Sequence, residues 1–121
     1  NVLIPALVIA GASDCVTPPA SNQTPMYNNM PTSCKHMVSI TQGSHCQFAQ
    51  NASLCNLAES FACPFRSYIS ASLQRSITLS VLEPWLDFML KERGSAWSQF
   101  QENLETLTGL GQISVVGACG E

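Results

Sequence analysis

Two side chains in the first half of the chain, Asp14 and His45, could work together as an acid–base pair. Asp14 follows an apolar run over residues 6–10, and His45 follows an alternating run over residues 37–41, each after a short turn that contains glycine. A carboxylate that accepts the Nδ1–H of an imidazole fixes the ring tautomer and leaves Nε2 free to take a proton from a nucleophile. The pair therefore predicts part of a Ser-His-Asp type of hydrolytic site.

The elements around the pair can bring the two side chains together. Residues 6–10 are apolar on both faces, as expected of an inner strand in a parallel sheet that helices cover on both sides. Residues 20–30 have helical spacing, and residues 37–41 alternate as a second strand. A strand, a helix and a parallel strand form one right-handed crossover, which places Asp14 and His45 at the same sheet edge. Neighbouring strands lie about 4.8 Å apart, so the carboxylate and the imidazole can meet.

The second half of the chain has a weaker pattern, followed by helices. Residues 46–66 show little periodicity, and we expect an irregular loop over the active edge, with one helical turn at most. Helical spacing returns over residues 68–93, where Pro84 either kinks the helix or marks the first turn of a separate one. Gly94 is expected to end this segment and Ser95 to begin another helix.

Length and charge restrict the function. A chain of 121 residues can bury a core as one domain. Charged residues make up only 11% of the chain, against about 25% in a typical protein. The net charge of −3 offers no basic patch for phosphates, so nucleic acid is not an expected partner. No apolar run approaches the roughly 20 residues that a transmembrane helix needs.

The cysteines predict disulfides. There are six, at positions 15, 34, 46, 55, 63 and 119, and an even number in a polar chain of low charge suggests an oxidising compartment, either extracellular or periplasmic. Buried thiols and a zinc site are the alternatives, but no two cysteines have C-x-x-C spacing. The sequence calls for no metal and no cofactor.

Topology partly constrains the pairing of these cysteines. Cys15 follows the carboxyl end of a predicted strand, whereas Cys34 precedes one, so roughly 17 to 20 Å of strand separates them. That distance exceeds the limit of about 7 Å between the Cα atoms of a disulfide, and we expect Cys15 and Cys34 not to pair. Of the 15 connectivities, we favour those that join Cys34 to Cys119. The other four, Cys15, Cys46, Cys55 and Cys63, would then pair near the active edge.

The two strand ends resemble a known family. The run Leu-Val-Ile-Ala-Gly-Ala-Ser-Asp-Cys-Val-Thr-Pro-Pro around Asp14 and the run Ile-Thr-Gln-Gly-Ser-His around His45 resemble the carboxyl-terminal part of bacterial polyester hydrolases. These are the cutinase-like and poly(ethylene terephthalate) (PET) hydrolase-like serine esterases of the α/β-hydrolase fold. The resemblance is good over about residues 3–48 and looser through the helix that contains Trp85.

The resemblance implies a fold, a reaction and roles for residues. The fold would be α/β, the last parallel strands and flanking helices of an α/β-hydrolase. Asp14 and His45 would be the triad acid and base, and Val16 would line the acyl-binding cleft. Ser44 and Cys46 would flank the base, with Ser44 on the substrate side. Members of this group often carry a stabilising disulfide next to these triad positions.

The whole chain would then form part of one domain. Residues 1–48 would be a strand–helix–strand unit with the triad Asp and His, residues 49–67 a cysteine-rich loop, and residues 68–121 the final helices. A last short strand is expected over residues 113–116.

The nucleophile of the family is missing from this sequence. It lies in a Gly-x-Ser-x-Gly motif at a strand-to-helix turn, and the chain has no such motif. The oxyanion-hole amides come from the same part of the fold. We therefore expect the chain to be a carboxyl-terminal piece that requires an amino-terminal segment of the same enzyme, and to be inactive alone.

Two hypotheses follow for function. The first is a secreted serine carboxylic-ester hydrolase, with a polyester, cutin or lipid ester as substrate. The second is a non-catalytic, disulfide-stapled secreted binding module, in which Asp14 caps a turn and His45 is a surface residue. Labelling by a fluorophosphonate probe would distinguish them.

Overall fold

The computed structural model describes residues 4–119. The two ends of the predicted domain lie outside the described residues, and so does Leu3, the first residue of the stretch that resembles the polyester hydrolases. Within this range the chain forms a mixed α/β structure with a three-stranded sheet. The elements in chain order are β1 (Ala6–Gly11), α1 (Gln23–Asn29), β2 (Lys35–Ile40), the 3₁₀ turn η1 (Cys46–Phe48), α2 (Ser53–Ala62), α3 (Ala71–Lys91), α4 (Gly94–Gly109) and β3 (Ile113–Ala118).

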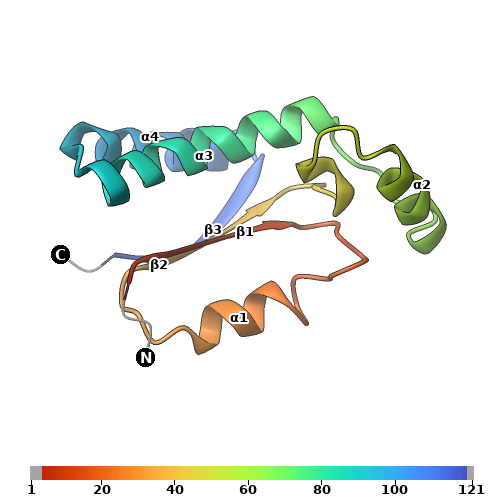
Figure 1. Ribbon diagram of the computed structural model, residues 1–121, viewed down its shortest axis with the longest axis horizontal. Helices are drawn as coiled ribbons and strands as arrows, with labels where there is room; N and C mark the ends of the chain where they lie inside the picture. Colours follow the sequence, from red (N-terminus) through yellow and green to blue (C-terminus); the bar gives the residue numbers. More distant parts are fainter. Residues whose placement is uncertain (1–3, 120–121) are drawn as a thin grey trace.

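The predicted strand–helix–strand unit is present. β1 and β2 pair in parallel, from Ala6 opposite Lys35 to Gly11 opposite Ile40. Their carboxyl ends are therefore level, and the turns that carry the candidate acid and base leave the sheet at the same edge. α1 crosses between them on one face of the sheet (Figure 1).

The sheet differs from the expected one in two respects. β3 is antiparallel to β2, with Ile113 opposite Ile40, so the third strand is not one of a parallel set. The strand order is β1-β2-β3, which makes β1 an edge strand of the described sheet instead of an inner one. The antiparallel direction of β3 follows from its connection. α4 returns the chain to the carboxyl end of β2, and β3 begins there, with Ile113 opposite Ile40.

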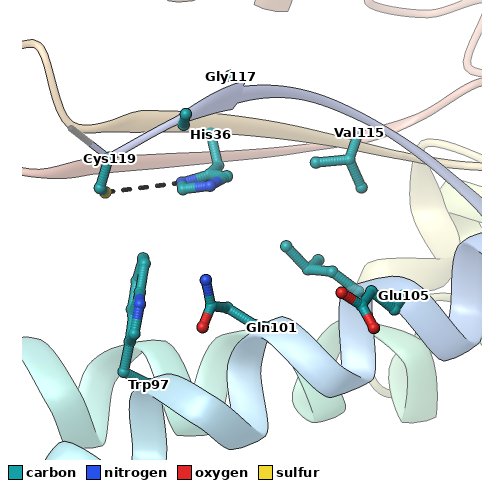
Figure 2. A pocket seen from close by; sticks show the side chains of 9 residues that line it. His36, Trp97, Gln101, Glu105, Val115, Gly117 and Cys119 are labelled. Carbon is teal, nitrogen blue, oxygen red and sulfur yellow. Dashed lines mark hydrogen bonds between the residues drawn. The ribbon is translucent and has the colours of Figure 1, made fainter. Parts of the chain in front are cut away.

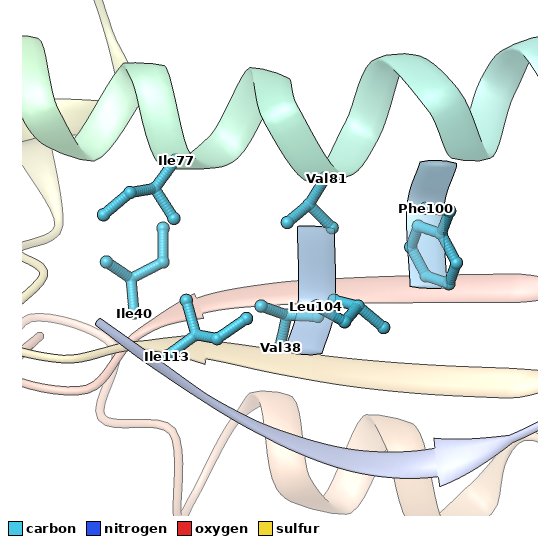
Figure 3. Close-up of a cluster of buried hydrophobic side chains, with 7 residues drawn as sticks. All are labelled: Val38, Ile40, Ile77, Val81, Phe100, Leu104 and Ile113. Carbon is cyan, nitrogen blue, oxygen red and sulfur yellow. The ribbon is translucent and has the colours of Figure 1, made fainter. Parts of the chain in front are cut away.

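The core lies between the sheet and the pair α3 and α4, which cover the face opposite α1 (Figure 1). Figure 3 shows its buried side chains, which come from β2, β3, α3 and α4: Val38, Ile40, Ile77, Val81, Phe100, Leu104 and Ile113. Alternate residues of β2 point to this face, as the period of a strand requires. By contrast α1 has no fully buried residue.

Two predictions about the helices are corrected. Residues 46–66 are not an irregular loop, because α2 occupies ten of them. Gly94 does not end the preceding helix: α3 stops at Lys91, Glu92 takes the left-handed conformation that closes it, and Gly94 is the first residue of α4. Pro84 lies inside a continuous α3 and starts no separate helix.

Candidate active site

Two glycines bring the turns after β1 and β2 into contact. A Cβ on Gly11 would lie 2.7 Å from the carbonyl oxygen of Gly43, so only glycine fits where the turns cross. The Ser13 N–H donates to that same oxygen at 2.9 Å, and the Asp14 N–H donates to the Gly11 carbonyl at 3.0 Å. Asp14 is thereby fixed beside the turn that leads to His45.

Asp14 and His45 form a hydrogen-bonded pair. Nδ1 of His45 lies 2.9 Å from Oδ2 of Asp14. Since a carboxylate only accepts, Nδ1 carries a proton and donates it, and the lone pair of the neutral ring is then on Nε2. The Asp14 side chain is 4% exposed and that of His45 is 37% exposed. The pair therefore has a buried acid and a base whose ring reaches the surface.

The surroundings of Asp14 favour its ionised form. Burial alone raises the pKa of the Asp14 carboxyl, but hydrogen bonds from the Thr17 backbone, from His45 and from the Thr17 hydroxyl outweigh that effect and hold the pKa below its ordinary value. Oδ1 accepts from the amides of Val16 at 2.9 Å and Thr17 at 2.8 Å, and Oδ2 accepts from the Thr17 hydroxyl at 2.9 Å. Asp14 thus remains an anion that can stabilise a protonated imidazole.

The other predicted site residues, Val16, Ser44 and Cys46, differ from one another in exposure. Val16 is 46% exposed and its amide is bound to Asp14, so its side chain is at the surface next to the acid. Ser44 is fully buried. It therefore presents no surface to a substrate in this structure, and its hydroxyl accepts from the Gln47 amide at 3.2 Å. Cys46, beside the base, is buried as well.

All six cysteines are paired. The disulfides are Cys15–Cys63, Cys34–Cys119 and Cys46–Cys55. The predicted bond between Cys34 and Cys119 is confirmed, as are the expected absence of a bond between Cys15 and Cys34 and the pairing of the other four cysteines with one another. Three disulfides fit a protein of an oxidising compartment.

Three polar residues of the site were not predicted from the sequence. The hydroxyl oxygen of Thr17 lies 3.1 Å from Nδ1 of His45. Glu59 and Gln74 hydrogen-bond to the backbone around His45. Spacing could have identified two of them. Cys55, Glu59 and Cys63 recur every four residues and so share one face of a helix, and Gln74 continues the buried stripe of α3.

The second histidine, His36, has no comparable partner in the part of the chain that the structure describes. His36 lines a pocket of about 280 Å³ between β3 and α4, at the opposite end of β2 (Figure 2). Its Nδ1 lies 3.9 Å from Sγ of Cys119, and no carboxylate hydrogen-bonds to it among residues 4–119. Burial lowers the pKa of its imidazole. Within the described residues, His36 is thus a buried histidine without a carboxylate partner, whereas His45 has one in Asp14.

Comparison with known families assigns the chain to one of them. Residues 1–75 match the PET hydrolase-like family, a stretch that includes both strand ends, α2 and the start of α3. The chain belongs to this family, and membership indicates an ester hydrolase. No curated protein and no solved structure gave a significant match.

No helix in the described part of the chain is long and apolar enough to cross a bilayer.

Proposed function

We propose that the chain supplies the acid and the base of a secreted serine carboxylic-ester hydrolase. The observation that supports this most directly is the pair formed by Asp14 and His45, in which Nδ1 is bound at 2.9 Å and Nε2 is left as the basic nitrogen. Family membership supports an ester as the substrate, of polyester, cutin or lipid type. The three disulfides support secretion.

Each residue has a defined part in the proposed reaction. Nε2 of His45 takes the proton of a serine hydroxyl while the serine oxygen bonds to the ester carbonyl carbon. The imidazolium then gives that proton to the leaving alcohol, and the acyl group remains on the serine. His45 next takes a proton from water as the water oxygen bonds to the acyl carbon, and the imidazolium returns that proton to the serine oxygen as the bond to the acyl group breaks and the acid is released. Asp14 stabilises the imidazolium in both halves, and Val16 contacts the acyl group.

The nucleophilic serine lies on a segment outside this sequence in our proposal. β1 is an edge strand whose outer side has no strand partner among the described residues, and its run is apolar on both faces. A parallel strand on that side would place its own carboxyl end beside Asp14 and His45, and the turn after such a strand would carry the serine and the oxyanion-hole amides. The chain alone should therefore not hydrolyse esters.

The test uses the full-length protein in which this chain occurs. His45→Ala should lower ester turnover by several orders of magnitude while the circular dichroism spectrum stays unchanged. His36→Phe is the matched control, because it removes the other histidine but keeps a ring in the core, and its turnover should equal that of the wild type. A fluorophosphonate probe should label a serine in the wild-type protein. Absence of labelling and of ester turnover would refute the proposal and favour a binding module.

A further inference from the structure

A buried carboxylate holds the backbone of the base. Glu59 is only 3% exposed, yet its carboxylate hydrogen-bonds neither a basic side chain nor a hydroxyl among residues 4–119. Instead Oε1 accepts from the His45 amide at 2.7 Å, and Oε2 accepts from the Cys46 amide at 3.2 Å. The two oxygens of Glu59 thus accept from two successive amides of the turn that carries the base.

A second buried side chain binds the residue before the base. Gln74 of α3 is completely buried. Its Oε1 accepts from the Ser44 amide at 2.9 Å, and its Nε2 donates to the Ser44 carbonyl at 2.9 Å. The backbone of residues 44–46 is therefore bound at four groups by side chains from two different helices, and it has no regular secondary structure before η1.

Disulfides join the helix that carries Glu59, and the residue directly after it, to the residues that follow Asp14 and His45. The bond between Cys15 and Cys63 attaches it to the residue after Asp14, and the bond between Cys46 and Cys55 attaches it to the residue after His45. Cys55 and Glu59 lie four residues apart on α2, and Cys63 is the residue directly after the helix. Figure 1 shows this helix beyond the carboxyl ends of β1 and β2.

Apolar burial does not account for the position of α2. Its large apolar residues are mostly exposed, with Leu54 at 82% and Phe61 at 78%. Its one fully buried residue is Glu59. A carboxylate is costly to bury unless it is paired or hydrogen-bonded, and the hydrogen bonds of Glu59 go to the His45 and Cys46 amides. Among the described residues, the side-chain hydrogen bonds and disulfides that link α2 and Cys63 to other elements go to the turns of the acid and the base.

We propose that Glu59 is a positioning residue for His45, and that α2 is a clamp that sets the distance and angle between the base and Asp14. This inference rests on the proposed function. Glu59 acts through the His45 backbone and does not touch the reacting atoms. Without it, the two amides would lose their acceptors and the turn would shift, which would misalign Nε2 from the serine hydroxyl.

The decisive variant is Glu59→Gln in the full-length protein. It keeps the volume and one acceptor oxygen but turns an amide NH₂ toward a backbone N–H, so the effect is on hydrogen bonding and not on packing. We expect kcat to fall about 10²-fold, the cost of a misplacement near 1 Å, with KM little changed. Glu102→Gln makes the same chemical change at an exposed position of α4, and its kcat should equal that of the wild type.

Nuclear magnetic resonance separates this inference from the proposed function. In the wild-type protein the amide protons of His45 and Cys46 should resonate downfield and exchange slowly, and in Glu59→Gln at least one should move upfield and exchange faster. An unchanged kcat in Glu59→Gln would overturn the inference, and so would wild-type amides that exchange as fast as those of an open loop, a measurement that needs no variant to fold. If the wild-type protein hydrolysed no ester, the proposed function would fail instead, while the amide signals would still report whether Glu59 holds the turn.

Discussion

Asp14 is the most constrained side chain of the candidate site. Its two oxygens accept hydrogen bonds from two backbone amides, one hydroxyl and the imidazole of His45. Most of these donors lie within three residues in sequence, so the short segment after β1 already determines the orientation of the carboxylate. Only the bond to His45 requires the second strand.

The lowered pKa of Asp14 makes folding stability depend on pH. Because the folded pKa lies below the ordinary value of 3.8, the carboxylate stabilises the fold above that value, and its contribution is lost as pH falls through the folded pKa. Asp14→Asn should lower the urea midpoint near neutral pH and lower it much less at the most acidic pH. Urea unfolding at a series of pH values measures this, and parallel curves for wild type and variant would contradict it.

His36 should cause a second, separate pH dependence. Burial lowers its pKa from the ordinary 6.5, so the unfolded chain takes up a proton that the folded chain refuses, and stability declines as pH falls below that value. His36→Phe keeps edge-on packing against Phe100, whose ring centroid lies 5.3 Å away, and should flatten the stability curve over this range. Urea midpoints across the range test it, and a wild-type slope that persists in His36→Phe would assign the effect elsewhere.

The two turns form one unit at the scale of elements, because Gly11 and Gly43 allow them to touch. Gly11→Ala would push its methyl group against a backbone carbonyl, and we expect a loss of about 1 to 3 kcal/mol in unfolding free energy, together with a fall in ester turnover. Gly109→Ala is the control, because nothing lies within 4 Å of its added Cβ. It should be neutral or stabilising by up to about 1 kcal/mol. Equal unfolding free energies for the two variants would argue against the contact.

Helix α3 continues through Pro84 because its neighbour supplies a donor. Proline has no N–H for the carbonyl four residues earlier, which is that of Ser80. That oxygen accepts from Nδ2 of Asn103 on α4 at 2.6 Å. A side chain from the adjacent helix thus replaces the missing bond, and a helix pair can accommodate a proline that a single helix would not.

This replacement predicts coupling between Pro84 and Asn103. Asn103→Ala should cost about 1 to 3 kcal/mol, since it leaves a carbonyl without a partner. In the Pro84→Ala background the restored backbone N–H can serve that carbonyl, so the same change should cost less. A double-mutant cycle by urea unfolding measures the difference, and strictly additive effects would show that the bond contributes nothing to the accommodation of the proline.

Local patterns were sufficient to predict the elements that present the acid and the base. The apolar run of β1, the alternation of β2 and the crossover between them come from nearby residues and from the handedness of such connections. The direction of β3 and the edge position of β1 depend on which strands are adjacent in space. No local pattern contains that information.

The helix α2 was missed for a different physical reason. Its large apolar residues Leu54, Leu57 and Phe61 are exposed, and its one buried residue is Glu59, so the usual amphipathic pattern is absent. Disulfides and hydrogen bonds, and not a hydrophobic stripe, hold α2 against the rest of the fold. The contacts of Glu59 and Gln74 to the His45 turn join residues 14 and 30 positions apart, and they become evident only once the helices are placed.

The disulfides act at two ends of the whole molecule. Two of them lie at the carboxyl end of the parallel strands and join α2 to the candidate site. The third joins Cys34, just before β2, to Cys119, just after β3. It therefore links β3 to β2 at the end of the sheet far from the candidate site. Disulfides thus join segments of the chain at both ends of the sheet.

Their effects on stability and on activity should therefore separate. In the chain-entropy account, a bond that spans 85 residues stabilises by roughly 4.5 kcal/mol and one that spans 9 residues by roughly 2.5 kcal/mol. Cys34→Ala/Cys119→Ala should therefore lower the urea midpoint more than Cys46→Ala/Cys55→Ala. Ester turnover of the folded fraction should show the opposite order, since only the shorter bond adjoins His45. If the loss of turnover followed the loss of stability in both variants, the bonds at the candidate site would serve the fold alone.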